Sequence, residues 1–212
     1  MSKKNLSLRV FFTVLGILLI YAAVAVNVKV AIGVGPIDSA ITTIAEIIGV
    51  KVGTFSMIFH GSFFVGQMII KKKDFKGKDY LQLFFIIGGG YIWNFFLYTV
   101  LQNVEFTLYP VRLVVFILAN IISAFGCLLI LDMKIMKTPL EGFLQLFADK
   151  IGTTLGKCRQ VADIFLLILS VVLILIFGTE WTVREGTVIS ALIYGPALDL
   201  MRKHIVSKWK FI

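Results

Sequence analysis

The sequence predicts an all-α polytopic membrane protein with six transmembrane helices, built as two inverted three-helix repeats that each contain a short re-entrant or interfacial helix. Three observations predict this fold class. Hydrophobic residues make up 58% of the 212 residues, and the mean hydropathy of +0.94 is well above that of a soluble chain. Long apolar runs alternate with short basic segments, and a weak internal repeat relates the two halves. The length fits one membrane domain over residues 1–212.

Six apolar runs are long enough to cross about 30 Å of hydrocarbon, which takes about 20 helical residues. The predicted spans are Arg9–Val28, Gly53–Ile70, Tyr80–Leu101, Arg112–Leu131, Val161–Gly178 and Gly186–Val206. The first run follows "SKKNLSLR" and contains "AVA", so it imitates a secretory signal with its cleavage site. Its apolar run is longer than a typical signal core, and we interpret it as a retained span.

The distribution of basic residues predicts that both termini face the cytoplasm. With the N-terminus inside, 17 of the 21 Lys and Arg residues fall in inner segments, and only Lys29, Lys51, Arg112 and Arg184 fall in outer ones. This asymmetry accounts for the net charge of +9 without a nucleic-acid partner, because the basic loops face the anionic inner leaflet. We expect a multi-pass protein of the bacterial cytoplasmic (inner) membrane. Its partners would be the lipid bilayer and an unidentified small molecule, and a homo-oligomer is compatible with the sequence.

A shift of 103 residues reveals the internal repeat, with repeat 1 at about residues 9–101 and repeat 2 at about 112–206. The shift aligns "GPIDSAITTIAEIIGVKVG", which begins at Gly35, with "TPLEGFLQLFADKIGTTLG", which begins at Thr138. The pairs that carry the match are Pro36 with Pro139, Asp38 with Glu141, Glu46 with Asp149, Gly49 with Gly152, and Gly53 with Gly156.

Both aligned segments have the pattern of a short amphipathic helix of about 13 residues, too short to span a bilayer. Proline suits the first helical turn, an acid two residues later interacts well with the positive helix end, and the glycine provides a stop. Each repeat contains three spans, an odd number, so the second repeat is predicted to be inserted upside down relative to the first. Inverted repeats with short broken elements are typical of alternating-access transporters.

The segment "AIGVGPIDSAITTIAEIIGVKVGTFSMI", with its G-x-G-P-x-D core, resembles the YczE/YitT-like family of bacterial integral membrane proteins. The resemblance extends to the basic "KKKDFKG" loop and to the Gly-rich third span. It implies a multi-span inner-membrane protein with a transport role, and it names no substrate. Where the family often has an acid in the third span, this chain has Asn94, which argues against a role that needs a carboxylate there.

Polar side chains within the predicted spans are the candidate substrate-binding residues. They are His60, Gln67, Trp93, Asn94, Arg159 and Asp163. Each also has a structural interpretation: an i, i+4 ion pair for Arg159 and Asp163, and a hydrogen bond between helices for His60. The three glycines of "GGGYIWN" either permit close helix packing or leave room for a ligand.

The residues of the two short helices are the candidate gating residues. They are Gly35, Pro36, Asp38, Glu46, Pro139, Glu141 and Asp149. For Asp38 and Glu141 helix capping is the structural alternative, and capping is compatible with gating.

No phosphate-binding loop, nucleophilic triad or metal-ligand spacing is present in the sequence, so we expect neither an enzyme nor a cofactor or metal. The function expected from the sequence is that of a small secondary transporter of a small organic solute, working by alternating access of the two repeats. Two alternatives stay open: a substrate-capture subunit of a multi-component importer, and a membrane accessory protein that transports nothing.

Overall fold

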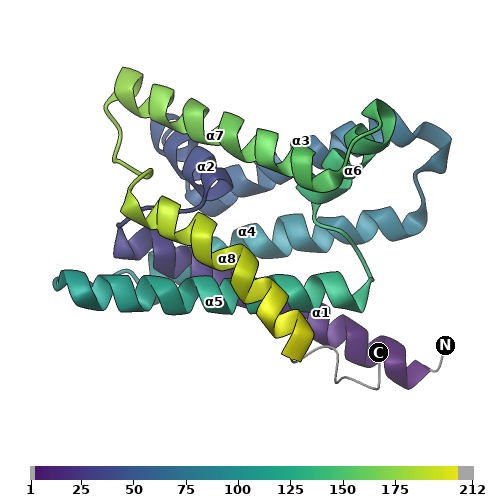
Figure 1. Ribbon diagram of the computed structural model, residues 1–212, viewed down its shortest axis with the longest axis horizontal. Coiled ribbons are helices and arrows are strands. Elements are labelled where there is room, and N and C mark those ends of the chain that lie inside the picture. Colours follow the sequence, from purple (N-terminus) through teal and green to yellow (C-terminus); the bar gives the residue numbers. More distant parts are fainter. Residues whose placement is uncertain (1–2, 205–212) are drawn as a thin grey trace.

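The computed structural model describes residues 3–204, except for the side chains of residues 3–5, 194–196, 198, 199 and 202, and every regular element in this part of the chain is helical (Figure 1). The longer helices are α1 (Lys3–Val30), α2 (Pro36–Ile47), α3 (Val52–Lys71), α4 (Gly89–Phe95), α5 (Tyr109–Met133), α6 (Pro139–Ile151), α7 (Leu155–Phe177) and α8 (Glu185–His204). The predicted all-α class is therefore confirmed.

Five helical segments of the described chain are long and apolar enough to cross a membrane, which is compatible with a multi-pass membrane protein. They are Leu6–Val30, Val52–Asp74, Gly77–Val100, Tyr109–Met133 and Leu155–Phe177, close to the first five predicted spans. The sixth predicted span corresponds to α8, which is a continuous helix but does not meet the same criterion over its described residues.

The third span is the irregular one. Before α4 the chain forms the 3-10 segment η2 (Gly77–Leu81) and the π-helical turn η3 (Phe84–Gly88), and after it the π-helical turn η4 (Phe96–Val100). Two of the three glycines of "GGGYIWN" serve close packing, because a Cβ at Gly89 would overlap the Tyr21 ring and one at Gly90 would overlap Met57, whereas a Cβ at Gly88 would meet nothing within 4 Å. The π turns carried no signal in the sequence; such turns are often found at functional sites.

The two short helices form where the repeat predicts them. Both begin with proline after an extended N-cap residue, Gly35 in α2 and Thr138 in α6. Gly49 and Gly152 follow the ends of these helices with the same φ of 70°, a conformation that glycine adopts without steric cost.

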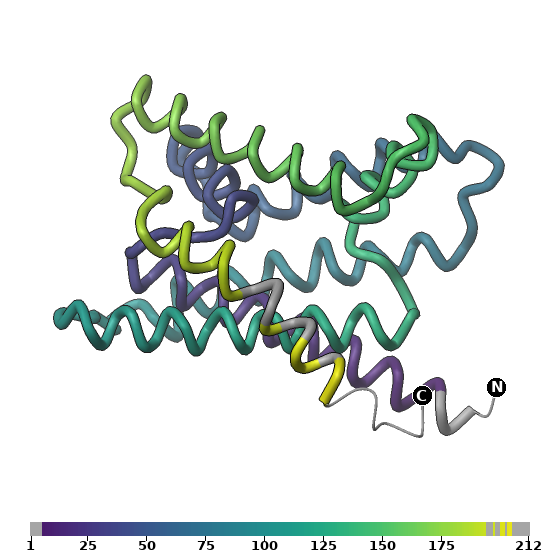
Figure 2. Tube along the Cα trace, viewed as in Figure 1, coloured from purple at the N-terminus to yellow at the C-terminus, as the bar shows by residue number. Residues whose placement is uncertain are grey.

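The linkers that precede the two short helices also share a backbone feature. The non-glycine residues Ala31 and Lys134 adopt left-handed φ angles of 55° and 54° at the ends of α1 and α5. The tube in Figure 2 shows that after α1 the chain turns back toward the middle of the molecule before α2 returns to the same end. The segment between α5 and α6 behaves similarly at the opposite end. These ends are called the Val30 end and the Met133 end below.

Packing between the helices crosses from one half of the chain to the other. The antiparallel helices α1 and α5 pack along much of their length, and in Figure 1 α7 lies on the opposite side of the molecule from them. Helix α2 of the first half packs on α7 of the second, and α6 of the second half packs on α3 of the first. Each short helix is therefore held by the other half of the chain.

Candidate functional site

Arg159, in the second turn of α7, is the centre of a charged group between the two halves. Its Nε donates to both carboxylate oxygens of Asp163, at 3.0 and 3.1 Å, and its Nη1 lies 3.7 Å from Glu141 Oε1. The contact with Asp163 is the i, i+4 ion pair expected from the sequence. Glu141 belongs to the first turn of α6, so Arg159 also ties α6 to α7.

Asp38 joins this group from α2. Its charge interacts with those of Arg159 and Asp163. Among the described residues the Asp38 carboxylate makes no hydrogen bond or ion pair, although the backbone carbonyl of Asp38 accepts a hydrogen bond from Thr42. We call Asp38, Glu141, Arg159 and Asp163 the Arg159 cluster. It contains three carboxylates and one guanidinium, so it carries an excess of negative charge when all four groups are ionised.

The first turns of the two short helices bring their acids to the same place. Asp38 and Glu141 are each the third residue of their helix, where the positive end of the helix dipole stabilises a carboxylate. Ile37 of α2 packs against the apolar cluster that contains Leu140 and Leu144 of α6. The N-terminal turns of α2 and α6 therefore approach each other beside Arg159.

Aromatic side chains from the first half of the chain pack beside the Arg159 cluster. The ring centroid of Tyr21 in α1 lies 5.3 Å from that of Phe85 in η3 and 5.9 Å from that of Trp93 in α4. The His60 ring in α3 contacts Phe85 edge-on at 5.5 Å. Ile37, which precedes Asp38 on α2, packs against the buried cluster that contains Tyr21, Phe85 and Trp93. We call Tyr21, His60, Phe85 and Trp93 the aromatic wall.

Two members of the aromatic wall have a buried polar atom without a hydrogen-bond partner. These atoms are His60 Nδ1 and Trp93 Nε1, whereas the hydroxyls of Tyr21 and Ser56 lie beside each other and interact. Ser56 lies one turn before His60 on α3, and the side chains of all four residues are at most 8% exposed. Burying a polar group without a partner costs about 1–3 kcal/mol, so two such groups in one place are typical of a site that takes water or a ligand.

Gln67 holds the start of α6 from the first half. Its Nε2 donates to the Pro139 carbonyl and to Gln82 Oε1, both at 2.8 Å, and the Gln82 amide returns a 3.1 Å hydrogen bond. A Cβ at Gly142 would come within 2.6 Å of Gln67 Oε1, so a larger residue there would displace the Gln67 amide. Of the predicted substrate-binding residues, Gln67 is thus placed as a support of the short helix.

Three other predicted site residues lie away from the Arg159 cluster. Asn94 accepts a hydrogen bond from the backbone N–H of Gly53 at 2.9 Å and so fixes the start of α3. The Glu46 carboxylate accepts from the Glu180 N–H at 3.1 Å, and Asp149 accepts from Gln145 at 2.8 Å.

An open cavity of about 560 Å³ lies at the Val30 end, along the polar face of α2. Thr42 and Glu46 of α2 line it, together with Lys29, Tyr98 and Glu180 among other residues. Thr42 and Glu46 follow Asp38 at intervals of four residues, so one face of α2 runs from the cavity to the Arg159 cluster.

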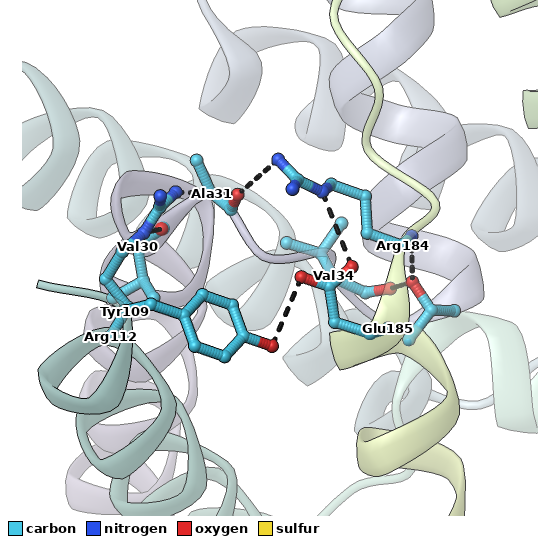
Figure 3. Close-up of polar contacts among 8 residues, drawn as sticks. Val30, Ala31, Val34, Tyr109, Arg112, Arg184 and Glu185 are labelled. Atoms are coloured by element: carbon cyan, nitrogen blue, oxygen red, sulfur yellow. Dashed lines mark hydrogen bonds and ion pairs between the residues drawn. The ribbon is translucent and has the colours of Figure 1, made fainter.

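Figure 3 shows how two arginines fix the segment between α1 and α2. Arg112 donates to the Val30 carbonyl at 2.6 Å and to the Ala31 carbonyl at 2.8 Å, and Arg184 donates to the same Ala31 carbonyl at 3.0 Å. The second half of the chain therefore holds the linker that sets the position of Asp38.

Glu185 completes this contact at the start of α8. It lies 3.6 Å from Arg184 and accepts a 3.4 Å hydrogen bond from Tyr109 (Figure 3). A hydrogen bond from its own backbone holds the pKa of Glu185 below its ordinary value, and the Arg184 charge acts in the same direction. The Glu185 carboxyl group is therefore ionised at neutral pH.

Tyr21, Ser56 and Phe85 are site residues that the sequence did not single out. Each is an ordinary member of an apolar run, and the contact that matters for each comes from another helix. A hydroxyl within a predicted span was the only signal available for Tyr21 and Ser56. No group of three or more His, Cys, Asp or Glu side chains within the described residues has the geometry to hold a metal ion.

Residues 7–203 match the model of one protein family, described as a family of unknown function (DUF6198). No curated protein and no solved structure matches the chain. The match covers nearly the whole sequence, including both short helices and all four residues of the Arg159 cluster. The chain belongs to the DUF6198 family.

Proposed function

We propose that this protein is a small secondary transporter that moves a small organic solute by alternating access of two inverted repeats. The observation that carries the proposal is the meeting of the two short helices at Arg159. Each helix comes from a different half of the chain, and each contributes an acid from its first turn. Sites at which short helices end within a bundle of spans are a common feature of secondary transporters.

Two further observations support two related halves. The left-handed pair Ala31 and Lys134 and the glycine pair Gly49 and Gly152 are each separated by the 103 residues of the sequence repeat. The packing of α2 on α7 is matched by the packing of α6 on α3 at the same shift. The proposed location is the bacterial inner membrane with both termini in the cytoplasm, in keeping with the basic loops and with the resemblance to the YczE/YitT-like family.

Purified protein reconstituted into vesicles provides the test. Vesicles with and without the protein are given a mixture of small metabolites and an imposed proton or sodium gradient, and the accumulated solutes are identified by mass spectrometry. We expect selective accumulation of one class of solute, and its loss in Arg159→Gln. Lys157→Gln is the matched control, because Lys157 is an exposed cation on the same helix.

The open cavity at the Val30 end favours a second candidate, the substrate-capture subunit of an importer, which would bind from one side. Tight binding of a solute without accumulation would support the capture subunit and contradict autonomous transport. Neither binding nor accumulation would contradict both and leave the accessory role.

A further inference from the structure

We propose that the site between the Arg159 cluster and the aromatic wall binds a small organic cation, an amine or quaternary ammonium compound that carries one further polar group. The inference rests on the proposed function, because it names the substrate class of the same site. The charges of the cluster, the rings beside it, the unpaired polar atoms and the route from the Val30 end support it in turn.

The charge of the cluster selects the sign of the ligand. Arg159 is already hydrogen-bonded to both oxygens of Asp163 and lies near Glu141, so carboxylates of the protein already balance its positive charge. The Asp38 carboxylate has no hydrogen bond or ion pair within the described part of the chain. An anion would have to displace one of these carboxylates from the guanidinium, whereas a cation meets a carboxylate that has no bonded partner.

The aromatic wall adds a second attraction for a cation. Ile37, the neighbour of Asp38, packs against the cluster that contains Tyr21, and Tyr21 packs against both Phe85 and Trp93. Faces of Tyr, Phe and Trp rings attract ammonium groups through their quadrupole, and such aromatic groups recognise quaternary ammonium ligands. A carboxylate beside three such rings therefore favours an organic cation over a strongly hydrated metal ion.

The unpaired polar atoms predict the rest of the ligand. Trp93 Nε1 is a hydrogen-bond donor without a partner, and His60 Nδ1 can donate or accept and has no partner either. Both residues are at most 8% exposed, so these atoms have little access to bulk water in the structure. A hydroxyl or amine group on the ligand would satisfy one or more of them, and a purely apolar cation would leave them unpaired.

Three helices connect this site with the cavity at the Val30 end. Thr42 follows Asp38 by four residues on α2, Leu97 follows Trp93 by four in the third span, and Val28 follows Tyr21 by seven on α1. In each pair the second residue lines the cavity, and the spacing places it on the same helix face as the first. Val28 and Leu97 also pack against the apolar cluster that contains Tyr21 and Trp93, so this cluster separates the cavity from the site.

The charged residues around the cavity contribute little to the selection of a cation over an anion. Glu46 and Glu180 line it together with Lys29, and Lys51 stacks over the Tyr98 ring at 5.5 Å. The charges there nearly balance, and the Lys29 ammonium is bonded to the Gln102 carbonyl. Selection for positive charge is therefore assigned to the deeper site at Asp38.

Calorimetric titration of the purified protein in lipid nanodiscs with three matched probes tests the inference. The probes are choline, its neutral isostere 3,3-dimethylbutan-1-ol and the anion 3,3-dimethylbutanoate, which are similar in size and differ chiefly in charge. We expect choline to bind at least 10-fold more tightly than either of the others. Equal affinity for the neutral isostere, or tighter binding of the anion, would overturn the inference without the need for any variant.

Variants locate the binding. Asp38→Asn is expected to weaken choline binding by at least 10-fold and Asp38→Glu to retain most of it, while Glu105→Gln, a change at an exposed acid between η4 and α5, leaves it unchanged. Choline binding that survives Asp38→Asn in folded protein would overturn the placement. Binding without accumulation in vesicles would leave the cation site in place and contradict transport. Accumulation of neutral or anionic solutes alone would support transport and overturn the cation site.

Discussion

Arg159 is the residue on which the charged cluster depends, because the carboxylates of Glu141 and Asp163 are only partly exposed and both lie beside its guanidinium. Arg159→Gln is expected to lower the free energy of unfolding by about 1–3 kcal/mol, since it leaves these carboxylates without a cation in a half-buried place. Arg159→Lys should cost less, because lysine keeps the charge and loses the two hydrogen bonds to one carboxylate. Thermal unfolding in detergent measures both, with Lys157→Gln as the control.

Gln67 holds the start of α6 through buried hydrogen bonds. Gln67→Leu removes the partner of the Pro139 carbonyl and of the Gln82 amide, so two buried polar groups are left unpaired. We expect a loss of about 1–3 kcal/mol in unfolding free energy. Gln145→Leu, which breaks an exposed glutamine–aspartate contact, should change stability by less than about 0.5 kcal/mol. Equal effects of the two substitutions would mean that Gln67 does not hold α6.

Contacts within one helix were predictable from the sequence, whereas contacts between helices were not. The bond between Arg159 and Asp163 was predictable because both residues lie on one helix, four positions apart. The contact of Arg159 with Glu141 and the meeting of Tyr21 with Trp93 join different helices, and no local pattern encodes them. The interhelical hydrogen bond expected as the structural alternative for His60 is absent among the described residues, and its ring instead contacts Phe85 edge-on.

At the scale of elements, the short helices were the most predictable part of the fold. Proline in the first turn and glycine after the last residue act locally, so Pro36–Ile47 and Pro139–Ile151 could be placed from sequence. The π turns on either side of α4 could not, because they depend on how the third span packs between Tyr21 and α3.

The contact between α1 and α5 allows a matched pair of glycine substitutions. A Cβ at Gly16 would come within 2.6 Å of the Gly126 carbonyl oxygen, which belongs to the backbone of α5 and cannot move alone. Gly16→Ala is therefore expected to destabilise the protein by about 1–3 kcal/mol. Gly61→Ala meets nothing within 4 Å and should be neutral or stabilising by up to about 1 kcal/mol, as alanine is the better helix former. Melting temperatures in detergent separate the two.

Hydrogen bonds from Arg112 hold the start of the linker between α1 and α2. Arg112→Gln removes the hydrogen bonds to the carbonyls of Val30 and Ala31, so the segment 31–35 should exchange its amide hydrogens faster. Hydrogen–deuterium exchange with mass spectrometry measures this directly. Lys51→Gln, a change at another basic residue of the Val30 end, should leave exchange in this segment as it is. No change in Arg112→Gln would show that other contacts hold the linker.

In the whole molecule, the proposed transport requires two halves that are inserted into the membrane in opposite directions. Composition and apolar run length predicted the helical class, and the bounds of five candidate spans were predicted to within six residues. The relation between the halves was visible in sequence only as a sparse set of matching residues. The matching φ angles at Ala31 and Lys134 add a conformational feature that the residue types alone do not carry.

Cysteine labelling at Ile48 and Ile151 tests this claim most directly. The two residues are related by the 103-residue shift, and their exposures of 51% and 55% make them accessible to a reagent. Cys127 and Cys158 are buried, so background labelling should be low. In intact cells an impermeant maleimide is expected to label Ile48→Cys directly and to label Ile151→Cys only after the membrane is permeabilised. Labelling of both positions from the same side would contradict the inverted arrangement.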